Sequence, residues 1–464
     1  MRGGAIRTSN LRYHIPLGTL LTCSSMLVDN RHPFNFMRQP KDYRAVIGGS
    51  EYLPLMIGGM GVDVSTSEMV LEAARLGCIA HLSDAMVPFL CDRDFGTTFT
   101  RNKAERHRRL QAEEFVPNRI PQFNPQEYRL AQIQYIAETV GKKKGTGCVF
   151  VNCMEKLQVG TSREILEIRL NASLDAGVDG ITLSAGLHGN SMRLMAEHPR
   201  FRDVKIGIIA SSWRALRLFL RSASRANRLP DYIVVEGPLA GGHLGFGDDW
   251  TQYILKEIVA DILNNLKNEG LHIPVIPAGG IFDADDTMFF LGMGAAAVQV
   301  ATRFAVAKES GLTNTAKQAF FEAEEKDVFV APVSPTGYPI RLLRSSPCLN
   351  SNVAPQCVSL GYAMDPKGHC QYIDAYNATG VSETGKKLPV VEKVCLCHHI
   401  GRYDTWTCGS SVVRLKETTT RDEEGTYQQP TTAQIIQEYL GERSPLHARS
   451  TPTQVSPLPE LVGT

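Results

Sequence analysis

The sequence predicts an α/β protein whose main part is a closed (β/α)8 barrel, also called a TIM barrel. From Leu53 to about Asp327 the chain repeats one pattern, in which a short apolar run precedes a longer segment with the 3.6-residue period of a helix. Apolar runs rich in valine and isoleucine are typical of parallel strands buried on both faces, and alternating β and α segments predict a parallel sheet. Eight such units in one continuous region favour a closed barrel over an open doubly wound sheet, which more often has five or six strands and a second domain.

Eight apolar runs are the predicted strands. In chain order they are LPLMIGG, CIAHLS, GCVFVNCM, GITLSAG, KIGIIAS, DYIVVEGP, HIPVIPAGG and AAAVQVATRF, at residues 53–59, 78–83, 147–154, 180–186, 205–211, 231–238, 272–280 and 295–304. Intervening segments such as SEMVLEAARLG (67–77) and TSREILEIRLNASLDAG (161–177) have the apolar spacing of helices that cover a sheet.

Four regions are predicted along the chain. They are an N-terminal arm (1–44), the barrel (45–330), a cysteine-containing extension that packs on the barrel (331–415), and a polar, partly disordered tail (416–464). After the second strand the barrel has an insertion, at about 88–144, with two helical segments. Its polar stretch TRNKAERHRRLQAEEF is interpreted as a solvated helix face or lid. In the tail, TAQIIQEYL (432–440) predicts one short helix.

Composition excludes several classes of protein. The 464 residues, 43% of them apolar, can bury a large core, and a formal charge of +1 gives no overall attraction to nucleic acid or to an acidic membrane. Eleven cysteines are too dilute for a disulfide-stapled scaffold and predict a reducing, cytoplasmic location. The run IPLGTLLTCSSMLV is interrupted by Pro16 and Gly18 and has no cleavage site after it, so it is not interpreted as a secretion signal. No apolar run is long enough to predict a membrane-spanning helix. The sequence is also compatible with a homo-oligomer.

The cysteines of the extension raise the question of a metal site. The candidate ligands are Cys357, Cys370, Cys395, Cys397, His398, His399 and Cys408. Structural zinc sites usually contain paired ligands at C-x2–4-C spacing, whereas only CLCHH is close-packed here, at C-x-C. We therefore predict core or loop cysteines and no metal, with zinc as the alternative.

Polar residues and glycines gather where the predicted strands end. Active sites of barrels lie at the carboxyl ends of the strands, so these positions are the candidate site. In chain order they are Gly58 to Gly61, Ser83 and Asp84, Asn152, Ser184 to His188, Ser211 and Ser212, Glu236 to His243, Gly279 and Gly280, and Gln299 to Arg303.

Two histidines lie at this predicted rim. His243, in AGGHLGFG, has glycines on both sides, which leave its side chain unshielded. Imidazole titrates near neutral pH and suits proton transfer, so His243 is the predicted catalytic residue. His188, in SAGLHGN, is the second candidate. The alternative for either residue is a core histidine bonded to a neighbouring carbonyl.

The loops after strands seven and eight predict a phosphate site. Glycines in PAGGIFDADD expose main-chain amides, Thr302 could add a hydroxyl and Arg303 a charge, and barrels commonly hold phosphate at these two loops. Alternatively, the glycines only permit tight turns. GGMGVD after the first strand lacks the G-x-G-x-x-G spacing of a dinucleotide site and is better interpreted as a turn that packs against a flat ring.

Together these motifs resemble the nitronate monooxygenase family. The resemblance runs over about residues 50–345, through PLMIGGMG, FVNCM, GVDGITLSAGL, EGPLAGGHLG, IPAGGI, GAAAVQVATRF and SPTGYPIR. It implies an FMN-containing barrel that oxidises alkyl nitronates or nitroalkanes with O2 to a carbonyl compound and nitrite. Flavin-dependent enoyl-acyl-carrier-protein reductases and NADH:quinone reductases share this scaffold.

The resemblance also implies roles for individual residues. His243 matches the catalytic base, and Asn152 and Met60 match residues beside the flavin ring. Glu236, Ser184 and His188 are expected to face the substrate. The other residues expected to hold FMN are Gly59, Gly241, Gly242, Gly279, Gly280, Gln299, Val300, Ala301 and Thr302.

The sequence departs from the family pattern in two places at the site. Glu236 replaces a glutamine found in many members, and Ala301 replaces the glycine of a Gly-Thr pair. A carboxylate would disfavour negative charge on a reduced flavin unless it is protonated. An NAD(P)H-dependent flavin reductase acting on quinones or enoyl thioesters is therefore kept as the alternative function, with a non-catalytic binding role as a third.

Overall fold

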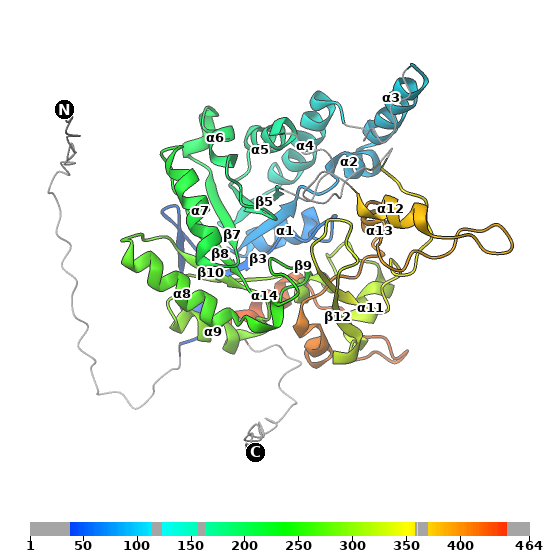
Figure 1. The fold of residues 1–464 in the computed structure, drawn as a ribbon. Coiled ribbons are helices and arrows are strands. Elements are labelled where there is room, and N and C mark those ends of the chain that lie inside the picture. Colours follow the sequence, from blue (N-terminus) through cyan, green and yellow to red (C-terminus); the bar gives the residue numbers. More distant parts are fainter. Residues whose placement is uncertain (1–37, 114–122, 156–162, 358–359, 361–369, 443–464) are drawn as a thin grey trace, which may run out of the picture. The chain divides into compact units, whose positions relative to one another are not determined.

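Eight parallel strands close into the barrel that the sequence predicts (Figure 1). The computed structural model describes residues 38–113, 123–155, 163–357, 360 and 370–442. The barrel strands are β3 (Leu55–Ile57), β4 (Ile79–Ser83), β5 (Cys148–Met154), β6 (Gly180–Ser184), β7 (Lys205–Ala210), β8 (Tyr232–Glu236), β10 (Val275–Ala278) and β11 (Val298–Val300). Neighbours in this order are paired, and β11 closes the barrel by pairing with β3.

Helices follow the strands and cover the outside of the barrel. Several begin at a side chain that accepts a hydrogen bond from the first turn, as Thr66, Ser212 and Asp283 do. The helices are α1 (Ser67–Arg75), α5 (Arg163–Asp175), α6 (Ser191–Met195), α7 (Trp213–Ser224), α8 (Leu255–Asn268), α9 (Ala284–Gly292), α10 (Thr302–Ala305) and α11 (Asn314–Glu322).

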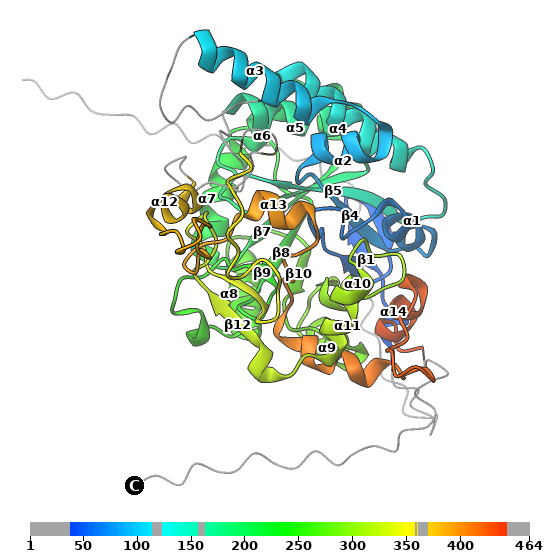
Figure 2. The same cartoon turned by 90° about the vertical axis from the view of Figure 1, so that its right-hand side faces the viewer.

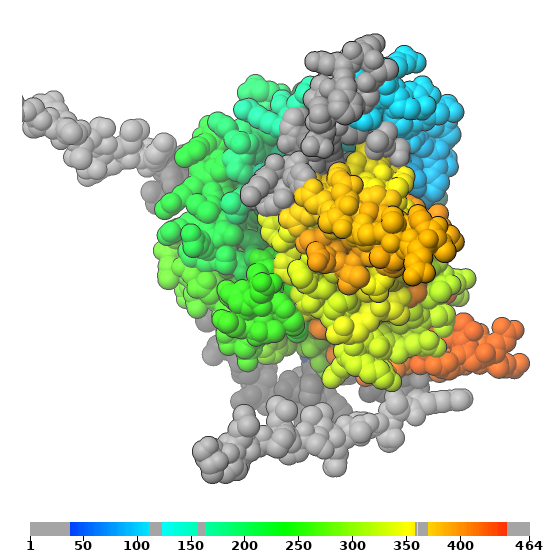
Figure 3. Space-filling view, turned by 45° about the vertical axis from the view of Figure 1, so that its right-hand side comes forward, coloured from blue at the N-terminus to red at the C-terminus, as the bar shows by residue number. Residues whose placement is uncertain are grey.

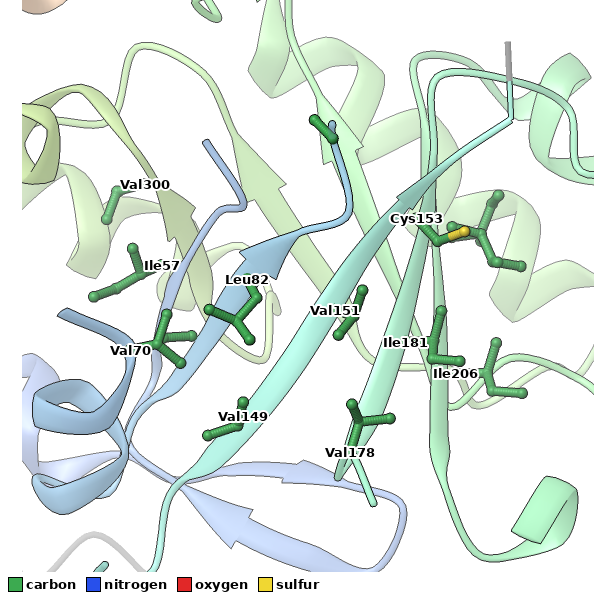
Figure 4. Close-up of a cluster of buried hydrophobic side chains, with 14 of the residues drawn as sticks. Ile57, Val70, Leu82, Val149, Val151, Cys153, Val178, Ile181, Ile206 and Val300 are labelled. Carbon is green, nitrogen blue, oxygen red and sulfur yellow. The ribbon is translucent and has the colours of Figure 1, made fainter. Parts of the chain in front are cut away.

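Strand side chains alternate between two apolar clusters. One cluster lies between strands and helices and is drawn in Figure 4, where Ile57, Leu82, Val149, Val151, Ile181 and Val300 of the strands accompany Val70 of α1. The other fills the barrel and includes Met56, Phe150, Tyr232, Val234 and Ile276. Because successive residues of a strand point to opposite faces, this division fixes which strand residues point into the barrel.

A polar chain crosses the inside of the barrel beneath its rim. His81 lies 2.7 Å from the carbonyl of Ile57 through Nδ1 and 2.5 Å from Oγ1 of Thr182 through Nε2. Thr182 in turn is hydrogen-bonded to the hydroxyl of Tyr232. Burial lowers the pKa of His81 to about 4, so this imidazole is neutral at pH 7 and its hydrogen bonds satisfy an otherwise costly buried group.

The insertion after β4 forms three helices where the sequence predicts two. They are α2 (Val87–Phe95), α3 (Phe99–Glu113) and α4 (Pro125–Val140), and they lie beside α5 on one side of the barrel (Figure 2). Gly96 ends α2 with φ of 68°. The carboxylate of Asp92 then accepts hydrogen bonds from the main-chain N–H groups of Phe99 and Thr100, at 2.7 and 2.8 Å. This capping starts a separate helix, which the apolar pattern alone does not reveal.

The extension packs against barrel segments, as Figure 3 shows in yellow and orange against green. Its strand β13 (Ile340–Leu343) pairs with β12 (Val328–Ala331) and with the short strand β9 (Gly242–His243). The tail helix predicted at 432–440 is α14. The remaining elements are β1 (Ala45–Ile47), β2 (Ser50–Tyr52), α12 (Gln371–Ala378), α13 (Leu396–Gly401), α14 (Thr432–Tyr439) and the 3-10 segments η1 (Pro40–Asp42), η2 (Pro199–Arg202), η3 (Trp250–Gln252), η4 (Glu325–Asp327) and η5 (Ser410–Thr418). In the part of the chain that the structure describes, no helix is both long and apolar enough to cross a membrane.

A buried ion pair joins the ends of β4 and β5 to α5. The guanidinium of Arg169 donates from Nε to the carboxylate of Asp84 at 2.8 Å and from Nη2 to the carbonyl of Met154 at 2.8 Å. Neither charged side chain is exposed to solvent. A buried charge that loses its partner is left uncompensated, so this pair fixes the relative positions of three barrel elements.

We predict that Asp84→Asn lowers the free energy of unfolding by about 3–5 kcal/mol, because it leaves the Arg169 charge without its counter-ion in the interior. Urea denaturation of the purified variant measures this loss. Glu138→Gln is the matched control. It breaks a pair with Lys142 whose side chains are 51% and 60% exposed, for which a loss below about 1 kcal/mol is expected. Equal losses in the two variants would contradict the structural role of the Asp84–Arg169 pair.

Candidate active site

Three polar side chains point into the carboxyl end of the barrel. Asn152 on β5 lies two residues beyond Phe150, which fills the barrel, and therefore points the same way. Ala278 also belongs to the interior cluster and is in register with Glu236 on one side and Gln299 on the other. The sequence predicted all three residues at this rim, and the strand register brings them to one end of the barrel.

These three side chains have polar atoms without a hydrogen-bond partner among the described residues. Oε1 of Gln299 is buried without a hydrogen bond to any described residue. The carboxamide of Asn152, whose residue is 8% exposed, and the carboxyl of Glu236 likewise form no hydrogen bond within the described residues. Buried polar groups in folded proteins are normally hydrogen-bonded. Gln299 carries such a buried group, and the side chains of Asn152 and Glu236, which have no hydrogen-bond partner among the described residues, lie at the same barrel mouth. Together they indicate a site for a polar ligand.

The turn after β3 passes close over this layer. A Cβ atom at Gly59 would lie 2.5 Å from Cβ of Asn152, so only glycine permits the approach there, whereas one at Gly58 would lie 3.2 Å from Nε2 of Gln299 and would require that side chain to shift. Met60 follows, and its N–H donates to Oγ of Ser65 at 2.9 Å, which fixes the end of the turn. The turn therefore forms one wall of the site.

His243 lies at the same rim on strand β9 and is held by the extension. Its Nε2 is 2.7 Å from Oγ of Ser334, and Ser334 is in turn 2.7 Å from Oγ1 of Thr336. Both hydroxyl side chains are fully buried. Burial lowers the pKa of His243 to about 4, so the imidazole is neutral at pH 7.

The surroundings of His243 differ from the bare glycine loop that the sequence suggests. Gly242 has φ of 76° and pairs with Arg341 of β13. A Cβ atom at Gly241 would lie 2.6 Å from the main chain of Cys408, so this glycine makes room for the extension. Arg341 is itself buried and donates from Nη1 to the carbonyls of Pro238 and Ala240, at 2.7 and 2.6 Å. The loop that carries His243 is thus held in place by strand pairing and by hydrogen bonds from Arg341.

The sequence pattern did not reveal the residues that hold His243. Ser334, Thr336 and Arg341 all lie in the stretch SPTGYPIR. The cluster of two hydroxyls and a guanidinium beyond the last barrel strand was the available signal. This cluster supports the family resemblance, but its sequence does not indicate which loop it contacts.

The loops after β10 and β11 form a corner whose main-chain donors include two without a partner among the described residues. Gly279 and Gly280 have φ of 97° and 84°, a region that favours glycine. The N–H groups of Gly280 and Ile281 donate no hydrogen bond to the described residues. Oγ1 of Thr302 accepts a hydrogen bond from the N–H of Gly409, at 2.9 Å. The partly buried Ala301 lies between Thr302 and Val300, whose carbonyl accepts the N–H of Gly58 at 2.9 Å.

Arg303 does not supply the charge that the sequence suggests for this corner. Its buried guanidinium is paired with the carboxylate of Glu438 on α14 and lies 5.2 Å from the centre of the Tyr439 ring. The side chain is therefore used to fasten α14 to the barrel. A phosphate at the corner would be held by main-chain N–H groups and a hydroxyl instead.

His188 is corrected from a candidate substrate contact to a core histidine. It is fully buried, and its Nδ1 and Nε2 lie 2.8 Å from Oγ of Ser191 and 2.7 Å from the carbonyl of Ser184. No ring nitrogen is left for a substrate. The hydroxyl of Ser184 is also directed inward, to the carbonyl of Cys153 at 3.4 Å. Hydrogen bonds inside the loop after β6 therefore use both side chains.

The cysteines considered as metal ligands lie in two places. The thiol of Cys357 is hydrogen-bonded to those of Cys370 and Cys397, with Cys395 in the same apolar cluster as Cys370. Cys408 belongs to a different cluster, beside η5. Within the described ranges, no group of three or more His, Cys, Asp or Glu side chains could hold a metal ion.

Architecture and site together define a class of protein, the (β/α)8 barrels that bind a polar ligand at the carboxyl ends of their strands. Residues 124–388, more than half of the chain, match the family model for nitronate monooxygenase. The chain therefore belongs to the nitronate monooxygenase family, whose members are flavin-dependent oxidoreductases.

Individual relatives are more distant. Over 111 residues the chain is 32% identical to a probable nitronate monooxygenase of Staphylococcus saprophyticus, a match that spans 24% of this chain and 31% of that protein. A nitroalkane oxidase from Streptomyces ansochromogenes has a TM-score of 0.51 at 16% identity, over 84% of this chain and 95% of that one. The enoyl reductase domain of MlnA, from the macrolactin biosynthesis cluster of Bacillus amyloliquefaciens, has a TM-score of 0.53 at 11% identity, over 84% and 94%. These two likenesses concern the fold.

Glu236 gives the site a pH dependence. Burial raises the pKa of Glu236 to about 7, so the folded state binds this proton more tightly than the unfolded chain does. The resulting stabilisation is complete below the unfolded pKa of about 4.3 and is lost as pH rises through about 7.

We therefore predict that Glu236→Gln stabilises the flavin-free protein relative to the unsubstituted one as pH rises from 5 to 8, by a difference on the order of 3 kcal/mol. Urea unfolding at each pH measures it. Glu138→Gln, at the exposed site, serves as the control and is expected to show no such trend. Parallel stability curves for Glu236→Gln and the unsubstituted protein would show that Glu236 does not titrate in this range.

Proposed function

We propose that this protein is an FMN-dependent oxidoreductase that oxidises alkyl nitronates with O2 to a carbonyl compound and nitrite. The observation that carries the proposal is the neutral imidazole of His243, held by Ser334 at the rim where the carboxamide of Asn152 and Oε1 of Gln299 have no hydrogen-bond partner in the described part of the chain. Family membership supports the flavin, and the polar rim supports a small polar substrate.

The residues at the rim fit FMN. The buried Oε1 of Gln299, which has no partner among the described residues, and the nearby carboxamide of Asn152 suit the polar edge of a flavin ring, and the glycine corner suits its phosphate. Gly59, Met60 and Asn152 would lie beside the ring. The residues that would hold the ring edge, ribityl chain and phosphate are Gly241, Gly242, Gly279, Gly280, Gln299, Val300, Ala301 and Thr302.

FMN supplies the electron acceptor and the reactivity toward O2, so the protein residues only bind, orient and move protons. Ser334 holds Nε2 of His243 in either tautomer, because its hydroxyl can accept or donate a hydrogen bond. When Nε2 carries the proton and donates it to Ser334, Nδ1 keeps the lone pair that can accept an α-proton from a neutral nitroalkane. When Nδ1 carries the proton, it can donate a hydrogen bond to a nitronate oxygen.

The lowered pKa of His243 favours a nitronate over a neutral nitroalkane as the substrate. An imidazole with a pKa of about 4 is a weak base, and general-base catalysis is most effective when the pKa of the base lies near the working pH. A nitronate arrives already deprotonated and needs only a hydrogen-bond donor. Glu236 would oppose a second negative charge at the site when ionised, so its raised pKa of about 7 limits that repulsion below neutral pH.

We predict that His243→Asn retains bound flavin but lowers turnover of neutral nitroalkanes by about two orders of magnitude, because the proton acceptor is lost. Turnover of preformed nitronates should fall less. Oxygen consumption and nitrite release measure turnover, and the flavin absorbance spectrum measures binding. His272→Asn is the matched control, since His272 is exposed and precedes β10, at the opposite end of the barrel. Near-normal turnover of nitroalkanes by His243→Asn would refute the assignment of His243 as the base.

A pyridine-nucleotide-dependent flavin reductase is the second candidate. Leu187 and Leu239, which follow β6 and β8 at the rim, are 44% and 41% exposed and offer apolar surface to a longer substrate such as an enoyl thioester. This function would use the same FMN residues, so the reductant distinguishes the two candidates.

We predict that anaerobic mixing with propionate 3-nitronate bleaches the flavin absorbance within the time of one catalytic turnover, whereas NADH and NADPH leave the absorbance unchanged on that timescale. Stopped-flow absorbance follows both reactions. Rapid bleaching by NADH or NADPH, with none by the nitronate, would establish the reductase in place of the nitronate oxidation.

A further inference from the structure

A short segment of the extension, residues 408–411, crosses the glycine corner and is called the strap. It makes a hydrogen bond to each of three rim loops. The N–H of Gly409 donates to Oγ1 of Thr302 at 2.9 Å, the N–H of Ser410 to the carbonyl of Leu239 at 3.1 Å, and Oγ of Ser411 to the carbonyl of Gly280 at 3.2 Å. The strap therefore joins the loops that follow β8, β10 and β11.

The strap fits tightly and is anchored. A Cβ atom at Gly409 would lie 2.9 Å from Oγ1 of Thr302, so there is no room for a side chain at this point. Immediately beyond the strap, Val412 and Leu415 are fully buried. Arg414 donates to the carboxylate of Asp283, the N-cap of α9, at 2.8 Å. These contacts make the strap a fixed wall of the corner.

The hydrogen bond from Ser411 sets the direction of a main-chain donor. In a trans peptide the C=O and N–H groups point to opposite sides, and the described residues contain no cis peptide bond. Because Ser411 holds the carbonyl of Gly280, the N–H of Ile281 in the same peptide unit points away from the strap. That N–H donates to no described residue, so it is left for a ligand.

The hydrogen bond from Gly409 has the same effect on Thr302. A hydroxyl group has one proton to donate and two lone pairs that accept. The N–H of Gly409 occupies one lone pair, and Thr302 donates its own proton to none of the described residues. The strap thus fixes the hydroxyl while leaving its proton for a neighbouring acceptor.

We propose that the strap completes an anion site, in which it positions the hydroxyl of Thr302 and the N–H of Ile281 to donate to the phosphate monoester of FMN. The inference rests on the proposed function, because it takes the FMN phosphate as the ligand. Gly409 and Ser411 are positioning residues here, since they act through Thr302 and Gly280. The extension is accordingly part of the cofactor site.

Ser411→Ala tests this inference, with FMN and with riboflavin, which lacks the phosphate. Flavin fluorescence quenching on the flavin-free protein measures both dissociation constants. The unsubstituted protein should bind FMN more tightly than riboflavin. In Ser411→Ala the affinity for FMN should fall about tenfold, about the effect of one hydrogen bond to a charged group, with riboflavin affinity unchanged. Ser224→Ala is the matched control, because Ser224 also donates to a main-chain carbonyl, that of Leu220 at 2.7 Å, but on α7.

The outcomes separate this inference from the proposed function. No binding of either flavin by the unsubstituted protein would overturn the proposed function. Tight binding of FMN with no change in Ser411→Ala, or with equal losses for FMN and riboflavin, would overturn the strap inference alone. If Ser411→Ala fails to fold, Ser411→Gly provides the same comparison, because it also removes the hydroxyl that donates to Gly280. A loss confined to FMN supports the inference, and a loss shared by both flavins refutes it.

Discussion

The alternation of side chains along the strands of a closed barrel is the constraint on which the whole site depends. Phe150 and Asn152 share a face of β5, so the same geometry that buries an aromatic ring in the barrel aims a carboxamide at its mouth. Glu236 and Gln299 are both in register with Ala278, an interior residue, so their side chains also point to the mouth of the barrel. A slip of one residue in register would turn these groups toward the covering helices, where polar atoms without partners would strongly destabilise the fold.

The barrel could be predicted from the sequence, because doubly buried parallel strands produce continuous apolar runs that stand out from helical spacing. All eight predicted runs contain a barrel strand, and the rim positions of Asn152, Glu236 and Gln299 follow from where the runs end. Partners far apart in the chain were not predictable. Ser334 lies 91 residues from His243, and Glu438 lies 135 residues from Arg303. His188 was misjudged for a related reason, since its local hydrogen bonds depend on a left-handed backbone, with φ of 48°, that sequence spacing does not indicate.

The extension supplies what the barrel rim lacks. Ser334 holds His243, Arg341 braces the loop before it, and Gly409 reaches Thr302. Each contact directs a polar group of a rim loop and leaves the layer below open, where the carboxamide of Asn152 and Oε1 of Gln299 have no hydrogen-bond partner among the residues that the structure describes. The two parts of the chain therefore make different contributions to the site. The strands provide inward-facing groups at fixed positions, and the extension fixes the loops that surround these groups.

Pairing of β3 with β11 has a consequence for biosynthesis. Leu55 is in register with Val298 and Ile57 with Val300, so nearly the whole barrel must leave the ribosome before its last seam can form. Until then the nascent chain carries two unpaired strand edges of high apolar content, and such edges promote aggregation. Chaperone protection during translation should therefore matter more for this protein than for one built from local hairpins, whose strands can pair as soon as they are made.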